Sequence, residues 1–254
     1  MTVNQPQIQN PDSPVRFELT GESVHIWQAS LIQNGRKQEL YSLLAVEERQ
    51  RAQRFRFEIH RERYIAGRGM LRILVGAYLN IDPALVRFCY SVHQKPMLDP
   101  FHKSELNFNL ANSDDRVVYL FSLKRRSGID LEYVHPMLDE DHFGKLYFSE
   151  RESRNLGALR DIEKTSYFFR LWTCKEAFLK AIGKGLTGEL SEVEVDFLPD
   201  GTARFLSLPG EAAQDWQLML FSPWENFQSA LAIEGDSAKI NFLDMEQMFA
   251  SRGI

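Results

Sequence analysis

The chain has 254 residues, of which 44% are hydrophobic and 26% are charged, so it can form one large domain or two small ones with a real core. Its net charge of -5 argues against bulk nucleic-acid binding, and its two cysteines are too few for a disulfide framework. The sequence shows neither a long apolar run nor a signal-peptide pattern, which predicts a cytoplasmic protein that does not enter a membrane.

The first half of the chain alternates strand and helix patterns. Residues 1–14 are polar and contain prolines, so we expect a flexible tail there. Hydrophobic periodicity then predicts a strand at residues 24–29, a charged helix at 46–55 and a second helix at 59–79. A strand at 86–92, a turn at 94–99, and strands at 107–110 and 117–123 around the polar loop 113–116 complete this half.

The second half repeats that order of elements. It begins with a strand around Asp130, followed by a charged helix at 150–159 and an apolar-faced helix at 166–181. A hairpin at 193–197 and 202–206 and strands at 216–221 and 227–233 follow, and residues 240–248 are expected to form a short amphipathic helix. The repeated order predicts an α+β protein with two similar α/β halves, residues 15–127 and 128–254, related by a pseudo-twofold axis. We expect its site in the seam between the halves.

Two carboxylates lie two residues apart on the first strand of the second half. In a strand, side chains at i and i+2 share a face, so Asp130 and Glu132 can point at one ion. Ile129 and Leu131 alternate with them, which indicates that the strand is anchored in a core. The alternative interpretation is a solvated face or an ion pair, which is the commoner fate of such a pair.

The helix at 166–181 carries a second charged group. Glu176 and Lys180, at i and i+4, share one face, and an apolar stripe lies opposite: Leu171, Cys174, Phe178 and Ala181. An exposed, salt-bridged helix is the alternative. Together with the strand, this pattern predicts Mg2+, or alternatively Mn2+, bound by Asp130, Glu132 and Glu176. The ion would take its remaining ligands from a substrate diphosphate.

Basic residues are concentrated between residues 49 and 72, although the chain is acidic overall. Most arginines on helices only solvate a face. A cluster of them nevertheless suits a ligand with separate phosphate groups, because guanidinium binds phosphate in a bidentate fork and stays charged.

The motifs, taken in order over residues 46–233, resemble those of the Sfp-type 4′-phosphopantetheinyl transferases. They are residues 47–51 with Phe55, 67–72, Lys95-Pro96, 108–113, 128–132, and 172–180 with 183–186 after it. The segments 128–132 and 172–180 are highly specific as a spaced pair, whereas the others are weak singly. The resemblance implies the same pseudo-twofold fold in a monomer. It also implies transfer of the phosphopantetheine arm of coenzyme A to a serine of apo acyl or peptidyl carrier proteins, which releases 3′,5′-ADP.

The resemblance also assigns residues to coenzyme A. Arg51 matches a basic contact to the 3′-phosphate, and Lys95 matches the lysine that reaches the nucleotide phosphates. Asn112 stands where the family has a histidine near the 3′-phosphate, and Ala111 replaces a serine. Asparagine donates a neutral hydrogen bond but cannot become cationic, so we expect weaker or differently balanced coenzyme A binding.

The expected mechanism is a metal-assisted displacement at phosphorus, in which Lys175 and Lys180 stabilise the developing negative charge. Glu176 is the expected general base, acting directly or through a metal-bound water, and the sequence does not choose between these routes. Two other functions stay open. One is a metal-dependent phosphohydrolase that acts on coenzyme A-like diphosphates, and the other is a carrier-binding module that has lost turnover. The sequence also leaves the class of carrier open.

Overall fold

The computed structural model describes residues 17–33, 35–93, 95–137, 139–185 and 190–251. The expected tail at residues 1–14 and Leu186 of the last motif lie outside this part of the chain. None of the described helices combines the length and the apolar character that a membrane crossing requires.

The first half follows the predicted order with two differences. Its elements are β1 (Ser23–Ser30), α1 (Lys37–Leu43), α2 (Val46–Gln53), α3 (Glu58–Leu79), η1 (Pro83–Leu85), β2 (Phe88–Tyr90), β3 (Pro96–Leu98), η2 (Pro100–His102), β4 (Leu106–Ser113) and β5 (Arg116–Leu123). The expected turn at 94–99 contains the short strand β3, which pairs with β2. Helix α1 was not predicted.

The second half repeats this order, element for element. It comprises β6 (Ser127–Tyr133), α4 (Glu140–Tyr147), α5 (Glu150–Ala158), α6 (Asp161–Ile182), η3 (Leu190–Glu192), β7 (Glu194–Phe197), β8 (Ala203–Ser207), η4 (Ala213–Asp215), β9 (Trp216–Phe221) and β10 (Phe227–Glu234). The predicted α+β fold with a pseudo-twofold repeat is confirmed. Helix α4 was not predicted.

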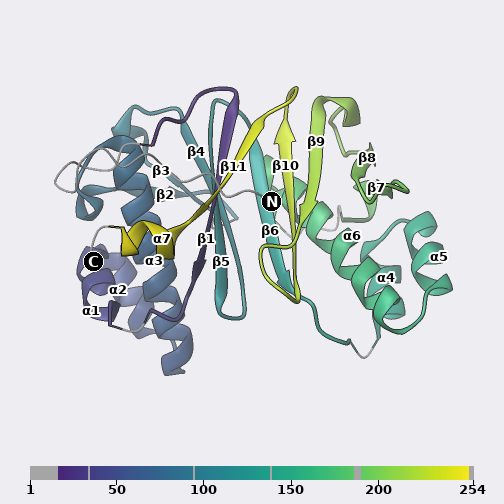
Figure 1. Ribbon diagram of the computed structural model, residues 1–254, viewed down its shortest axis with the longest axis horizontal. Helices are drawn as coiled ribbons and strands as arrows, with labels where there is room; N and C mark the ends of the chain where they lie inside the picture. The colour runs from purple at the N-terminus through teal and green to yellow at the C-terminus, as the bar shows by residue number, and fades with distance from the viewer. Residues whose placement is uncertain (1–16, 34, 94, 138, 186–189, 252–254) are drawn as a thin grey trace.

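Two sheets occupy the centre of the molecule, and the helices cover its two ends (Figure 1). One sheet has the order β11-β1-β5-β4 and the other has the order β6-β10-β9. Each half has its own hydrophobic core between its sheet and its helices. A third buried cluster, which includes Val24, Leu120, Ile129 and Leu231, joins the two sheets.

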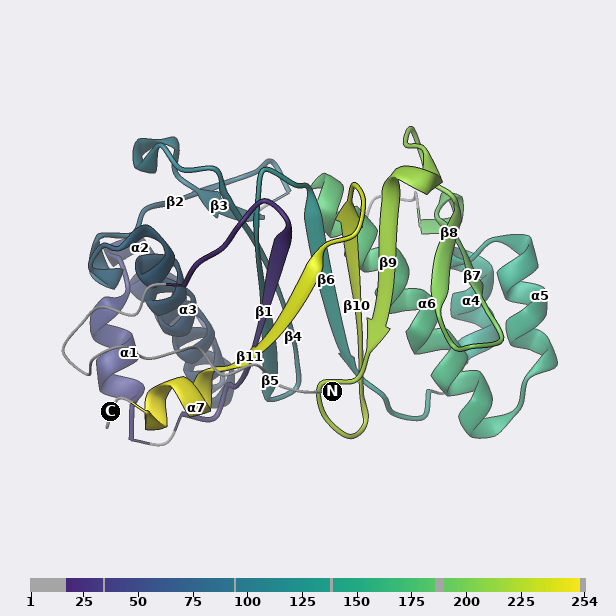
Figure 2. The ribbon, with the colours of Figure 1, turned by 45° about the horizontal axis from the view of Figure 1, so that its top comes forward.

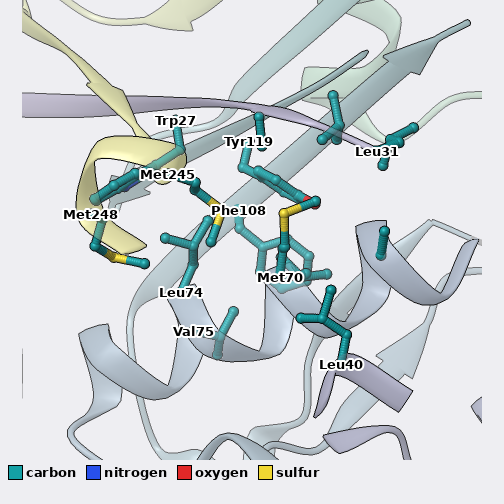
Figure 3. Close-up of a cluster of buried hydrophobic side chains, with 14 of the residues drawn as sticks. Trp27, Leu31, Leu40, Met70, Leu74, Val75, Phe108, Tyr119, Met245 and Met248 are labelled. Atoms are coloured by element: carbon teal, nitrogen blue, oxygen red, sulfur yellow. The ribbon is translucent and has the colours of Figure 1, made fainter. Parts of the chain in front are cut away.

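The last elements of the chain return to the first half, which corrects two predictions. Residues 240–248 were expected to form one helix, but they belong to β11 (Lys239–Asp244) and α7 (Met245–Ala250). Strand β11 pairs in parallel with β1, and α7 lies beside the helices of the first half (Figure 2). Met245 and Met248 complete the first-half core next to Trp27 and Leu74 (Figure 3). The second half therefore ends before β11, and not at residue 254.

The two halves repeat a buried ion pair as well as an order of elements. Glu48 accepts a hydrogen bond from the backbone N–H of Ala45, the N-cap residue of α2, at 2.9 Å, and another from Arg72 Nε of α3 at 2.7 Å. Glu152 closes the capping box of α5 and lies 2.7 Å from Lys175 Nζ of α6. In each half a carboxylate thus satisfies the first turn of one helix and ties it to the next.

Strand β6 and helix α6 meet very closely, and this contact positions the site. A Cβ atom at Gly128 would collide with the backbone of Ala177 and Ala181, so only glycine allows this approach. Helix α6 ends at Gly183, whose φ of 75° is favourable for glycine. Asp130 of β6 and Glu176 of α6 are thereby carried on elements in direct backbone contact.

Candidate active site

A pocket of about 280 Å³ lies where the two halves meet. Its walls come from the β2–β3 hairpin and β4 of the first half, and from α6 and the residues after it in the second half. The lining residues are His93, Lys95, Pro96, Asn109, Leu110, Glu176, Leu179, Lys180, Gly183 and Gly185. This arrangement agrees with the expected position in the seam.

Asp130 of β6 does not line the pocket but contacts Lys180, which does, and it is only 4% exposed. Its Oδ1 atom is 2.6 Å from Nζ of Lys180, whereas its Oδ2 atom is buried without a hydrogen-bond partner among the described residues. Burial raises the pKa of Asp130, and the charge of Lys180 opposes this shift. The lysine therefore compensates the carboxylate only in part.

Glu176 is the second buried carboxylate, and it is 8% exposed. Its Oε1 atom also has no hydrogen-bond partner. Burial and the negative charge of Asp130 raise the pKa of Glu176 to about 7, against the opposing charge of Lys180. The Glu176 carboxylate can therefore gain or lose a proton near neutral pH.

Glu132 is held from both halves of the molecule. Ser113 of β4 donates a hydrogen bond from Oγ to Glu132 Oε2 at 3.0 Å, and the Trp172 indole of α6 donates another. Burial and the nearby Asp130 raise the pKa of Glu132. Asp130, Glu132 and Glu176 thus lie close enough for their charges to interact.

These carboxylates suit a hard cation in their chemistry, although they do not form a closed coordination cage. In the described ranges, no group of three or more His, Cys, Asp or Glu side chains is gathered tightly enough to hold a metal ion. Asp130 and Glu176 nevertheless each leave one buried oxygen without a partner. Burial raises the pKa of all three carboxylates, and the charge of Asp130 raises the pKa of Glu132 and Glu176 further, so a divalent cation would stabilise their ionised forms.

Lys95 brings a second ammonium group to the pocket. Its Nζ atom donates to the backbone carbonyl of Lys180 at 2.5 Å. Burial and, to a smaller extent, the charge of Lys180 lower the pKa of Lys95 to about 8. Two neighbouring cations from opposite halves suit an anionic ligand.

The predicted phosphate contact by Lys175 is wrong. Its side chain is 0% exposed and pairs with Glu152, and Nζ also donates to the carbonyls of Leu190 and Val193. These partners hold Nζ in the core of the second half, and Lys175 is not among the residues that line the pocket. Lys175 instead fixes the chain that follows α6.

Arg51 and Asn112 do not line the pocket. Arg51 is exposed on α2 with its guanidinium 5.6 Å from the Tyr64 ring, and Asn112 is exposed near the end of β4. Their contacts with coenzyme A stay predictions.

Sequence reasoning missed several residues of the site. His93, Asn109 and Leu110 line the pocket, and Ser113 contacts Glu132. Asn109 and Ser113 lie four residues apart in a strand, so they share a face with the buried Ala111. The alternation of side chains along this strand was the sequence signal that could have placed Asn109 and Ser113 together.

Comparison with known proteins agrees with the resemblance of the motifs. Residues 126–232 match the model of the 4′-phosphopantetheinyl transferase superfamily, and residues 27–122 match that of the 4′-phosphopantetheinyl transferase N-terminal region. The 4′-phosphopantetheinyl transferase HetI of Nostoc sp. is 39% identical over 87% of this chain and 92% of its own. The 4′-phosphopantetheinyl transferase Sfp of Bacillus subtilis is 30% identical over 63% of this chain and 69% of its own.

Among solved structures, a holo-(acyl-carrier-protein) synthase from Bacillus anthracis in complex with CoA (3′,5′-ADP) is 22% identical. The superposition covers 43% of this chain and 96% of the synthase chain, with a TM-score of 0.37. The two family models and the extended identity to HetI establish the relationship. The chain belongs to the 4′-phosphopantetheinyl transferase superfamily.

Proposed function

We propose that the protein transfers the 4′-phosphopantetheine of coenzyme A to a serine of an apo acyl or peptidyl carrier protein and releases 3′,5′-ADP. The observation that supports this activity best is the composition of the pocket between the halves. Lys95 and Lys180 bring two cations to it, and Glu176 brings a carboxylate with a raised pKa. Family membership supplies the reaction that this combination serves.

The cations of the pocket would bind the phosphates of coenzyme A. Charge-assisted hydrogen bonds from ammonium to phosphate are short and strong, and they gain strength where the site is partly closed to water. Lys180 reaches the site from α6 while Lys95 reaches it from the β2–β3 hairpin, so a diphosphate between them would bridge the two halves.

Mg2+, or Mn2+ in its place, would be held by Asp130, Glu132 and Glu176. When bound, such an ion neutralises diphosphate charge and acts as a Lewis acid. The two carboxylate oxygens that lack partners, on Asp130 and Glu176, support this assignment.

Glu176 is the proposed general base. The carrier serine must lose its proton as its oxygen attacks the β-phosphorus, and Glu176 would accept it directly or through a metal-bound water. Lys180 would stabilise the negative charge that develops as the bond to 3′,5′-ADP breaks.

The proposal also includes a cytoplasmic monomer. The described pocket takes residues from both halves of a single chain, so a second copy is not needed to build it. Cys89 and Cys174 are free thiols, which suits a reducing compartment.

Intact-mass spectrometry tests the proposed activity. The full chain would be incubated with coenzyme A, Mg2+ and apo-carriers of the fatty-acid, polyketide and peptide-synthetase classes, with a carrier whose serine is replaced by alanine as the control. We expect at least one carrier, but not its alanine variant, to gain one phosphopantetheine. Release of phosphopantetheine without any carrier would indicate a phosphohydrolase, and carrier binding without any turnover would indicate a binding module.

A further inference from the structure

Strand β6 lies at the edge of its sheet, with β10 as its neighbour on one side. Amide groups alternate in direction along a strand, so half of those in β6 point away from β10, toward β4. The amides of Ile129, Leu131 and Tyr133 belong to this outward set. A buried amide without an acceptor costs free energy comparable to a lost hydrogen bond, so the buried Ile129 amide needs a partner, whereas the Tyr133 amide lies at the exposed end of the strand.

Side chains supply the partners that a neighbouring strand would otherwise provide. Asn109 Oδ1 accepts the Ile129 N–H at 2.9 Å, and Ser113 Oγ accepts the Tyr133 N–H at 3.0 Å. Both acceptors lie on β4, four residues apart, and both donors lie on β6, four residues apart. Strands β4 and β6 therefore run side by side in one register, joined through side chains.

The middle amide has a different partner. Ala111 lies between Asn109 and Ser113 on the same face of β4, and its methyl group cannot accept a hydrogen bond. The Leu131 amide instead lies close enough to the Asp130 carboxylate to lower its pKa. The edge of β6 thus faces a carboxylate of the site at this position.

Ser113 makes a second contact that bears on the site. Its hydroxyl has a single proton, and because Oγ accepts from Tyr133, that proton is donated to Glu132 Oε2 at 3.0 Å. Glu132 also accepts from the Trp172 indole of α6, which belongs to the second half like Glu132 itself. The orientation of Glu132 therefore depends on hydrogen bonds from both halves.

We propose that Asn109 and Ser113 are positioning residues, which fix the free edge of β6 against β4, and that Ser113 orients the Glu132 carboxylate for the reaction. The contact with the edge stands independently of function, whereas the effect on catalysis rests on the proposed transfer reaction. The first and last side chains of the motif 109–113 thus act on the strand that carries the carboxylates.

Amide hydrogen exchange followed by NMR tests the contact in the full chain without ligand. In Ser113→Ala we expect the Tyr133 amide to exchange about five to ten times faster, the effect of one lost hydrogen bond, with little change at Ile129. Asn109→Ala should show the reverse. Ser122→Ala is the control for a general effect on β6, because the Ser122 hydroxyl bonds the Arg125 carbonyl and Ser127 at the start of that strand, and exchange at Tyr133 should not change in it. Unchanged exchange at Tyr133 in Ser113→Ala would overturn the contact.

Metal affinity and kinetics test the positioning role. Loss of a residue that orients a metal ligand typically costs ten- to hundredfold in metal affinity or activity. We expect Ser113→Ala to weaken Mn2+ binding about tenfold, measured by electron paramagnetic resonance with coenzyme A but no carrier, and to lower kcat to a similar extent. The KM for coenzyme A should not change, and Ser113→Thr should restore both losses because it keeps the hydroxyl.

The outcomes separate this inference from the proposed function. Wild-type Mn2+ affinity and kcat in Ser113→Ala, together with faster exchange at Tyr133, would overturn the positioning role. If wild-type protein modifies no carrier at all, the proposed function fails, while exchange and Mn2+ affinity still decide whether Ser113 orients Glu132.

Discussion

Lys180 Nζ lies 2.6 Å from Asp130 Oδ1 and so joins helix α6 to strand β6 at the seam. The contact satisfies one oxygen of Asp130. Among the described residues, the other oxygen of Asp130 and one oxygen of Glu176 have no hydrogen-bond partner. Three interacting carboxylates lie near two ammonium groups here, of which Lys180 contacts Asp130 directly and Lys95 contacts the backbone carbonyl of Lys180. The site therefore has a local excess of negative charge that a cation would relieve.

Asp130→Asn removes a charge from the site but keeps the shape of the side chain. We expect carrier modification to fall roughly a hundredfold or more, because loss of one electrostatic group in an active site has effects of this size. The midpoint of thermal unfolding should stay equal or rise, since burial disfavours the charged form of Asp130. Mass spectrometry and a thermal melt check both. Asp200→Asn, in the exposed β7–β8 turn, is the control, and wild-type turnover in Asp130→Asn would refute the assignment.

Lys95→Met tests the phosphate contact from the first half. A hydrogen bond to a charged group is worth about 1.5–3 kcal/mol, so we expect the KM for coenzyme A to rise by roughly ten- to a hundredfold with a smaller change in kcat. Steady-state kinetics with a modified carrier would measure both constants. Lys239→Met removes an exposed lysine of β11 and should behave like wild type. An unchanged KM for coenzyme A would exclude Lys95 from the phosphate site.

Lys175→Met should impair stability and not coenzyme A binding. Removing one partner of a buried ion pair leaves an unpaired charge on Glu152, at a cost of about 3–5 kcal/mol in the free energy of unfolding. The double variant with Glu152→Gln should recover part of that loss, because neither charge is then buried. Urea unfolding measures stability, and calorimetry measures coenzyme A affinity. A stable Lys175→Met protein with weakened affinity would restore Lys175 to the phosphate site.

His25 should contribute a loss of stability in mild acid, opposite in sign to the contribution of Glu176, whose pKa is raised. Burial lowers the pKa of His25 from 6.5 to about 4 in the folded protein, so between these values the unfolded imidazole binds more protons than the folded one. The His25 contribution therefore rises with pH through this window and is lost as pH falls from 6.5 toward 4, by roughly 3 kcal/mol in full. Urea unfolding between pH 7.5 and 4.5 should show a flatter dependence in His25→Gln, whereas the exposed His60→Gln should follow wild type. Parallel curves for His25→Gln and wild type would disprove this contribution.

Local periodicity predicted most of the fold, because most elements bury one face. The spacing of Leu171, Cys174 and Phe178 indicated the buried stripe of α6, and all three side chains are buried. The short helix α1 and the strand β11 show weaker hydrophobic periodicity than α6 does. Strand β11 forms because β1 offers it an edge, and that partner is distant in sequence. No window of neighbouring residues contains this information.

The site was predictable only where two chemical groups share a face within one element. Glu176 and Lys180 do so on α6, and the charges of both act on Asp130 and on one another. Lys175 could not be assigned in this way, because its partner Glu152 comes from another helix. The capping-box pattern of Ser149 and Glu152 was visible in the sequence, yet nothing in it indicated that the glutamate also binds a lysine.

The return of β11 to β1 constrains the order in which the molecule can be completed during synthesis. Gln28 and Asp244 are hydrogen-bonded although 216 positions separate them. Until the ribosome has released β11 and α7, the edge of β1 is bare and the places of Met245 and Met248 in the first core are unfilled. The first half is thus translated early but finished last, and a chain interrupted before residue 239 leaves an open strand edge that can pair with another chain.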